Sequence, residues 1–188
     1  IGGVGLLDDF TKSATLAFKA EGEAILLIGD TQGWLGQSIW LRDVCGREEG
    51  APPPVDLVAE KRNGDVVRGM IHAGTATAVH DLSDGGLLVA LAEMAMAGDL
   101  GATLDAVPAA LVPHAWWFGE DQARYVVTVP DSELLGVLTK LKTVDVPVTQ
   151  IGKTGGRSLV IEGEGEIAVA KLRHAFEHWL PAYMGGQG

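Results

Sequence analysis

The segment Thr77–Gly98, which reads TAVHDLSDGGLLVALAEMAMAG, constrains the fold more than any other part of this chain. Thr77–Val79 is predicted to end a strand, the polar HDLSD stretch to form a turn, and Gly85–Ala97 to form a helix whose one charged residue is Glu93. A helix that is apolar almost all round is buried on most of its faces. The chain must therefore fold with this strand-to-helix corner beside its core.

Hydropathy patterns outside this segment alternate between strands and helices, which predicts an α+β chain. The expected strands are Gly3–Leu7, Ala14–Lys19, Ala24–Ile28, Tyr125–Val129, Val148–Gly152 and Ser158–Glu162. The expected helices are Ser38–Val44, Val55–Ala73, Ser132–Lys142 and Glu166–Tyr183, the last burying Phe176, Trp179 and Leu180 among other apolar residues.

Composition narrows the possible partners. The formal net charge is −11 with no cluster of Lys and Arg, which argues against nucleic acid as the main partner. No apolar run approaches the roughly 20 residues of a membrane span, so a membrane is not expected as a partner. The single cysteine, Cys45, cannot form an internal disulfide and fits a reducing, cytoplasmic location; it is expected to be buried filler.

The corner has two means of binding a phosphorylated ligand. Backbone N–H groups at a helix start attract anions, which makes Ser83, Asp84, Gly85 and Gly86 candidate nucleotide- or phosphate-binding residues. Asp81 sits at a strand end, where a carboxylate has no routine structural role and can bind Mg²⁺.

Simpler explanations stand beside these. Asp84 has the right type and place to cap the following helix, and this is the favoured interpretation. His80 beside Asp81 could belong to a metallohydrolase, but a neutral histidine that fixes the turn by hydrogen bonds is preferred. For Gly29–Ser38, a phosphate loop is possible, yet it lacks the ending of a P-loop, and a connecting loop is preferred.

A second polar group stands in FGEDQARY, where Glu120, Asp121 and Gln122 come shortly before an apolar strand. Three polar side chains at this place indicate the rim of a pocket. The alternative is a solvated loop in which Arg124 pairs with a nearby acid. Trp116 and Trp117, just upstream, are expected to anchor the core.

HDLSDGGLLVALAEMAMAG followed by WFGEDQARYVV resembles the C-terminal domain of the synthetase superfamily that contains aminoimidazole ribonucleotide synthetase. The likeness is strongest to the last such domain of the phosphoribosylformylglycinamidine synthase family, and GGVGLLDD and GDTQGWLGQS also match. It covers about residues 1–183 and implies a layered α/β sandwich with a mixed sheet. Residues 1–183 are then one C-terminal domain from a longer chain, and residues 184–188 a flexible tail.

The resemblance also implies a function. That family uses ATP to convert formylglycinamide ribonucleotide and glutamine-derived ammonia to formylglycinamidine ribonucleotide in purine biosynthesis. Mg²⁺ and ATP or ADP are the implied cofactors. The implied partners are the N-terminal synthetase domains of the same polypeptide, a glutaminase subunit and a small accessory subunit.

The resemblance assigns roles to individual positions. Asp81 stands where the family's first half has a Mg²⁺-binding aspartate, and Glu120, Asp121 and Gln122 stand at a substrate-contacting Glu-Ser-Gln. No catalytic residue is expected in this part of the polypeptide, so the chain alone should be inactive. The stretch Trp34–Ser38 departs from the usual Glu-Leu-Gly-Gly-Ser, which weakens a phosphate-binding role there.

Two alternatives remain open from the sequence. One is another ATP-dependent enzyme of the superfamily, such as aminoimidazole ribonucleotide synthetase, selenophosphate synthetase or a thiamine-phosphate kinase. The other is a non-catalytic scaffold domain, in which the acidic turn only caps a helix.

Overall fold

The computed structural model describes residues 2, 4–108 and 110–186, and its centre is a seven-stranded sheet. The strand order is β2-β4-β1-β5-β3-β6-β7, and every neighbouring pair is antiparallel except the parallel pair β3 and β6. The strands are β1 (Ala24–Ile28), β2 (Ala78–Asp81), β3 (Ala102–Leu104), β4 (Tyr125–Val129), β5 (Val148–Thr154), β6 (Ser158–Ile161) and β7 (Gly165–Ala168).

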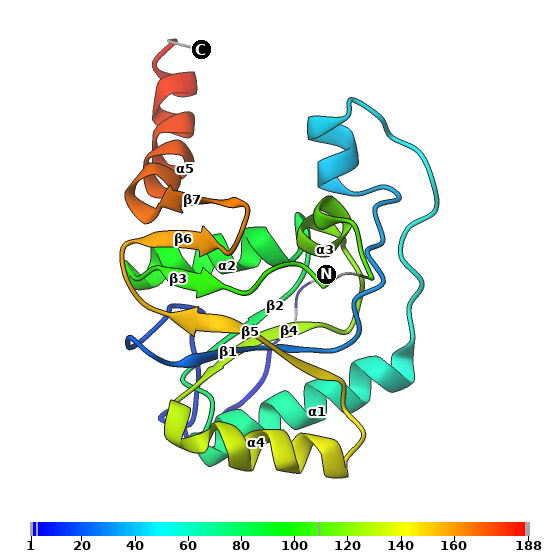
Figure 1. Cartoon of the computed structure of the whole chain (residues 1–188), viewed down its shortest axis with the longest axis vertical. Helices are drawn as coiled ribbons and strands as arrows, with labels where there is room; N and C mark the ends of the chain where they lie inside the picture. The colour runs from blue at the N-terminus through cyan, green and yellow to red at the C-terminus, as the bar shows by residue number, and fades with distance from the viewer. Residues whose placement is uncertain (1, 3, 109, 187–188) are drawn as a thin grey trace.

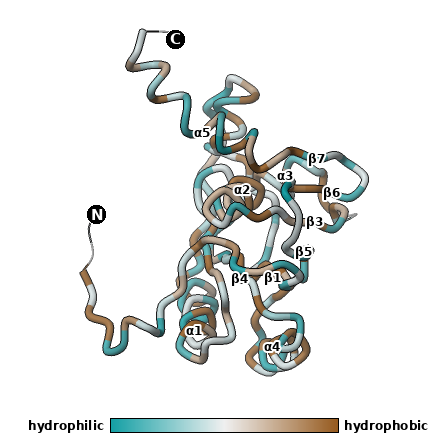
Figure 2. Tube along the Cα trace, turned by 90° about the vertical axis from the view of Figure 1, so that its left-hand side faces the viewer, coloured by the Kyte–Doolittle hydropathy of each residue, from teal (hydrophilic) through white to brown (hydrophobic). Residues whose placement is uncertain are grey.

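Helices cover both faces of this sheet, as Figure 1 and Figure 2 show. They are α1 (Leu57–Ala73), α2 (Gly86–Gly98), α3 (Pro113–Phe118), α4 (Asp131–Thr143) and α5 (Val169–Met184), with a short π-helical segment η1 (Trp40–Val44). The pair α1 and α4 packs on one face, and α2 lies on the other. The predicted α+β sandwich with a mixed sheet is confirmed. Within the described residues, no helix is both long and apolar enough to span a membrane.

The central strand β1 contributes side chains to two hydrophobic cores, one on each face of the sheet. Its five residues, AILLI, are all buried, because a strand covered on both faces carries apolar side chains at every position. Ile25 and Leu27 point into the cluster that holds α2, whereas Leu26 and Ile28 point into the cluster beneath α1 and α4. The apolar helix α2 is buried as predicted, and Trp116 and Trp117 anchor the same cluster.

The N-terminal prediction is wrong. No strand forms at residues 4–7 or 14–19, and Thr15 makes only an isolated bridge to Ala78; Gly3 lies outside the described residues. Val4 and Leu6 are exposed, and Figure 2 shows this segment leaving the body of the molecule. An apolar pattern is not enough for a strand when no neighbouring strand accepts its backbone hydrogen bonds.

The C-terminal prediction needs a similar correction. Gly165–Ala168 pairs with β6 as strand β7, so the last helix starts only at Val169. That helix projects beyond the sheet (Figure 1), which leaves Phe176, Trp179 and Leu180 exposed instead of buried. Met184 belongs to α5, and residues 187 and 188 of the expected tail lie outside the described residues. Cys45 is also exposed and is not core filler.

Candidate functional site

Glu120 is the point where three motif segments meet. Its Oε1 atom accepts a hydrogen bond of 2.8 Å from the N–H of Gly85 and another of 2.8 Å from the N–H of Ile39. Gly85 belongs to the strand-to-helix corner, and Ile39 directly follows the glycine-rich loop. One carboxylate therefore fastens the corner, that loop and the FGEDQ segment together.

The start of α2 is built by glycine rather than by an Asp84 cap. Gly85 is the N-cap residue, with φ of 82°, and the N-cap position makes no side-chain capping hydrogen bond. Gly86 also has positive φ, and a Cβ there would lie 2.5 Å from the carbonyl oxygen of Gly119. Only glycine fits a left-handed conformation with so close a backbone neighbour. The prediction that Asp84 caps this helix is wrong, because the acceptor comes from Glu120 instead.

The two glycine N–H groups proposed for phosphate already have acceptors within the chain. The N–H of Gly85 donates to Glu120, and the N–H of Gly86 donates to the carbonyl of Ser83 at 3.1 Å. An incoming anion would have to replace Glu120 at the first of these groups. The side chains of Ser83 and Asp84 are exposed.

Asp121 fastens the glycine-rich loop from the other side. It is 8% exposed and accepts hydrogen bonds from the backbone N–H groups of Gly33, at 3.0 Å, and Trp34, at 3.3 Å. Gly33 has φ of 77°, and a Cβ there would meet the Cβ of Ala115 at 2.7 Å. The loop is thus held against α3 by a carboxylate, which agrees with the connecting-loop interpretation.

Arg124 forms the buried centre of this arrangement. It is 1% exposed and donates to the carbonyls of Asp121, at 3.0 Å, and Gly119, at 2.5 Å, and to Thr31 Oγ1, at 3.1 Å. Burial lowers the pKa of Arg124, and the Asp121 carboxylate, 3.8 Å away, opposes this shift. The sequence left Arg124 as a possible partner in a solvated loop. A charged residue directly before a buried strand was the signal for a paired, buried group.

Asp81 is exposed at the end of β2 and is not part of this group. It pairs across the strands with Tyr125, and side chains alternate along a strand, so Asp81 lies on the same side as Val79, toward α1. Burial is the main cause that raises the pKa of Tyr125, and the charges of Glu60 and Asp81 add to it. Asp81 therefore faces Tyr125 and α1, whereas Glu120 faces the start of α2.

The favoured interpretation of His80 was a histidine that fixes the turn by hydrogen bonds, and His80 does make hydrogen bonds there. Its Nε2 lies 2.7 Å from Glu93 of α2, and its Nδ1 lies 3.4 Å from Asp81. This joins β2 to α2. Across the part of the chain that the structure describes, no three His, Cys, Asp or Glu side chains are grouped so that they could hold a metal ion. Asp81 alone fits Mg²⁺ only as one of several ligands, the others coming from a nucleotide, water or another domain.

A polar cleft of about 190 Å³ opens beside Gln122. Asp121 and Gln122 line it, together with Asp30 and Gln32 after β1 and Arg62 on α1. Of the three residues expected at a pocket rim, Asp121 and Gln122 line this cleft. Glu120 lies instead at the strand-to-helix corner. The buried side chain of Asn63 closes the cleft from α1 and donates to the carbonyl of Ala123 at 2.9 Å.

Comparison with known proteins identifies the family. The sequence profile described as "AIR synthase related protein, C-terminal domain" matches residues 20–163. The chain belongs to this family. Among curated relatives, phosphoribosylformylglycinamidine synthase subunit PurL of Rhodopseudomonas palustris strain BisA53 is 79% identical, and that of Nitrobacter hamburgensis is 76% identical. Each alignment covers 100% of this chain but 25% of the relative, so the chain spans about a quarter of their length.

Solved structures share the fold. Thermotoga maritima PurL complexed with FGAR has a TM-score of 0.72 at 19% identity, covering 87% of this chain and 30% of that one. Thiamine-monophosphate kinase from Stenotrophomonas maltophilia has a TM-score of 0.56 at 18% identity, covering 82% of this chain and 54% of that one. At these identities the likeness concerns the fold alone.

Proposed function

We propose that this chain is the C-terminal domain of a phosphoribosylformylglycinamidine synthase. Residues 1–183 form the domain within a longer polypeptide, which uses ATP to convert formylglycinamide ribonucleotide and glutamine-derived ammonia to formylglycinamidine ribonucleotide. The observation that carries the proposal is the identity of 76% and 79%, along the whole chain, to relatives that bear this enzyme's name. The chain supplies no catalytic residue of its own, so it is inactive alone.

Within that enzyme, the corner and the polar cleft would face the nucleotide and the substrate. Asp81 is exposed and is the proposed single Mg²⁺ ligand from this domain, with further oxygens from the nucleotide and the N-terminal domains. Ser83 and Asp84 are exposed beside it, and Gln122 lines the cleft. Gly85 and Gly86 could bind phosphate only after Glu120 has moved away from Gly85.

The proposed partners are the N-terminal synthetase domains of the same polypeptide, a glutaminase subunit and a small accessory subunit, in the cytoplasm. Structures titled PurL complexed with ATP, PurL complexed with ADP, and PurLQS, all from Thermotoga maritima, support the nucleotide and the assembly. The net charge of −11 agrees with partners other than nucleic acid.

A pair of activity measurements tests this function. The longer polypeptide that carries this chain should turn over formylglycinamide ribonucleotide with ATP and ammonia, and the 188-residue chain should not. Turnover by the 188-residue chain would contradict the assignment of all catalytic residues to other domains. A longer polypeptide that instead phosphorylates thiamine monophosphate would point to another enzyme of the superfamily.

The hydrogen bonds of Glu120 favour a second candidate, a scaffold domain that binds no nucleotide. The N–H groups of Gly85 and Gly86 are satisfied within the chain, and Asp121 is likewise bonded to the glycine-rich loop. Titration of the longer polypeptide with Mg-ADP, before and after Asp81→Ala, separates the two functions. A scaffold gives identical affinities, whereas a domain that shares in nucleotide binding gives a weaker one after the change.

A further inference from the structure

Helix α5 carries two histidines, His174 and His178, that the proposed synthetase role does not use. Side chains four residues apart lie on the same face of a helix. The two imidazole rings are accordingly close, with centroids 4.0 Å apart and ring planes at 38°. Both residues are exposed. Two histidines at this spacing on a helix bind zinc in metalloproteases, because both rings can reach the same ion.

The ring nitrogens of this pair are not taken up by other groups of the described residues. Within that part of the chain, every hydrogen bond or ion pair that involves a histidine ring belongs to His80, which contacts Glu93 and Asp81. A neutral imidazole binds a metal ion through either of its ring nitrogens. Each ring of the α5 pair therefore has a nitrogen to offer to a metal ion.

The pair lies on the side of α5 that faces away from the core, on a helix that projects beyond the sheet (Figure 1). Val169 is buried in the α2 cluster and Leu172 packs against it, which holds the first turn of α5 to the body of the molecule. Each residue advances about 100° around a helix, so His174 and His178 stand on the opposite side from these two. The exposed Phe176 stands on the apolar side. A domain that packed against that apolar side would leave the histidine pair accessible.

The charges around the pair are mixed. Arg173 and Glu177 are paired with each other, at 3.5 Å. Lys171, three residues before the first histidine, opposes a cation, but it is exposed, and water and salt screen its charge. The metalloprotease motif has its catalytic glutamate directly after the first histidine, where this chain has Ala175. The pair is therefore suited to binding a metal ion, and no hydrolytic reaction is inferred.

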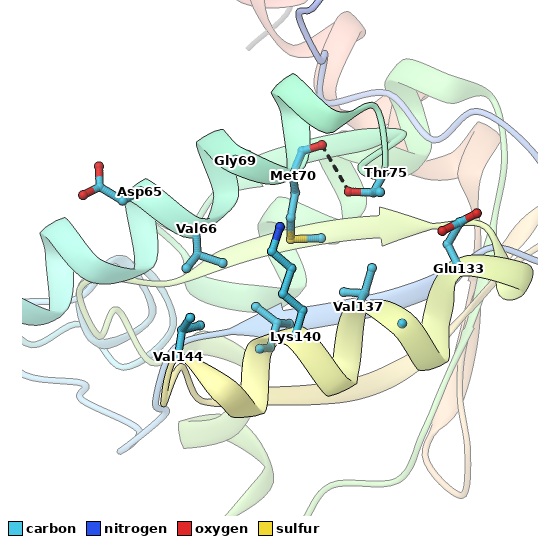
Figure 3. A pocket seen from close by; sticks show the side chains of 11 residues that line it. Asp65, Val66, Gly69, Met70, Thr75, Glu133, Val137, Lys140 and Val144 are labelled. Atoms are coloured by element: carbon cyan, nitrogen blue, oxygen red, sulfur yellow. Dashed lines mark hydrogen bonds between the residues drawn. The ribbon is translucent and has the colours of Figure 1, made fainter.

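The acids that line the apolar groove between α1 and α4 show the contrast. Figure 3 shows Asp65 and Glu133 at opposite ends of that groove. Asp65 is already paired with Lys61, at 2.6 Å, and with Arg68, at 3.0 Å. These two carboxylates are apart and one of them is neutralised, whereas the two imidazole rings of α5 are adjacent.

We propose that His174 and His178 together bind one divalent transition-metal ion of the kind that imidazole favours, such as Ni²⁺, Cu²⁺ or Zn²⁺. Nitrogen–metal distances are about 2.0–2.1 Å, and rings this close bring two nitrogens to one ion by turning about their side-chain torsions. No three potential ligands are grouped in the described residues, so water fills the other coordination positions. Mg²⁺ prefers oxygen ligands and is not bound here. The site is separate from the proposed Mg²⁺ ligand Asp81 and does not depend on the proposed function.

Nickel, zinc and magnesium chlorides are the probes, titrated by calorimetry into the 188-residue chain and into the longer polypeptide, both without a histidine tag. Ni²⁺ and Zn²⁺ should bind, and Mg²⁺ should not compete with them. His174→Ala and His178→Ala should each weaken Ni²⁺ binding by about tenfold or more, because the second ring acts at a high effective concentration. His72→Ala, at an exposed histidine on α1, is the matched control and should leave the affinity unchanged.

Two double variants test the spacing of the pair. Ala175→His with His178→Ala keeps the number of histidines but places them on different faces of α5, so it should bind Ni²⁺ as weakly as His178→Ala alone. Ala170→His with His178→Ala restores a pair four residues apart, one turn earlier, and should recover the affinity. Both alanines are exposed, so neither change disturbs the core.

Equal Ni²⁺ affinity in His174→Ala and the unchanged chain would overturn the proposal. Undiminished affinity in the variant with adjacent histidines would do so too, because the number of histidines alone would then explain the binding. Binding to the 188-residue chain that is lost in the longer polypeptide would overturn it as well.

Discussion

The carboxylate of Glu120 accepts a hydrogen bond from the N–H of Gly85, the N-cap residue of α2, from 35 positions further along the chain. A helix start is usually satisfied by a neighbouring side chain. Here the acceptor comes from a separate loop and also binds the N–H of Ile39. The corner, the glycine-rich loop and FGEDQ therefore form one structural unit, and a change at Glu120 affects all three.

Replacing Glu120 with alanine should lower the free energy of unfolding by about 3 kcal/mol, because two hydrogen bonds to a charged group are lost. Glu120→Gln keeps one acceptor oxygen and should cost less. Urea unfolding of the 188-residue chain measures both. Glu164→Ala, at an exposed turn, is the control and should change stability by less than about 0.5 kcal/mol. A loss as small as the control's would show that the Glu120 contacts do not support the fold.

Asp121→Ala should loosen one backbone segment, and Glu120→Ala should loosen another. Asp121 accepts from Gly33 and Trp34, so their amide hydrogens should exchange faster when it is removed, while the amide of Gly85 keeps its protection. Glu120→Ala should give the opposite pattern. Native-state hydrogen exchange resolves the two. If both variants expose the same amides equally, the two carboxylates do not act on separate segments.

Much of this fold can be predicted from hydropathy patterns within short stretches of the sequence. The apolar run of β1, the spacing of α1 and the continuous apolar surface of α2 each predict their element, because burial on one or two faces leaves a period in the sequence. The strands β3 and β7 were missed, since each is only three or four residues long and is defined by its partners. The exposed face of α5 was missed for the opposite reason: its apolar stripe is real, but none of the residues that the structure describes covers it.

The site was predicted at the level of segments rather than of contacts. The family resemblance indicated that HDLSDGG and FGEDQ belong to one site, and Glu120 does join the two segments. The sequence could not indicate which acid reaches the helix start, because the acceptor lies far along the chain from Gly85. Asp84 was the nearer candidate and was wrong, and Asp81 faces Tyr125 instead of Glu120.

A comparison of two aspartates tests the helix caps directly. Asp56 accepts hydrogen bonds from the N–H groups of Val58 and Ala59 and caps α1, so Asp56→Ala should cost about 1 kcal/mol. Asp84 makes no such bond at α2, and Asp84→Ala should cost less than about 0.5 kcal/mol. Thermal and urea unfolding of the two variants supply the comparison. Similar losses in both would mean that Asp84 caps α2 in solution.

Tyr125 provides a test at alkaline pH. Its pKa is raised above the ordinary value of 10.0 by burial, then by Glu60 and Asp81. The folded state thus holds the phenol proton more tightly than the unfolded state does. This contribution to stability is present below pH 10 and is lost as the pH rises through the folded pKa.

Asp81→Asn and Glu60→Gln should each lower the pKa of Tyr125, because each removes a negative charge near the phenol. Ultraviolet titration of the folded chain in a Tyr183→Phe background isolates the Tyr125 signal. Asp105→Asn, at the residue that directly follows β3, three strands away from β4 in the sheet, serves as the control. An unchanged titration after Asp81→Asn would place that carboxylate away from Tyr125.

Asp81→Ala in the longer polypeptide should weaken the binding of Mg-ADP, because the change removes the carboxylate that we propose as a Mg²⁺ ligand. Stability should change little, since the side chain is 74% exposed and its hydrogen bond to His80 is long, at 3.4 Å. Equilibrium dialysis with and without Mg²⁺ measures the effect. The matched control is Asp105→Ala, which should leave affinity unchanged. A loss of ADP affinity that persists without Mg²⁺ would mean that Asp81 acts on the fold rather than on the metal.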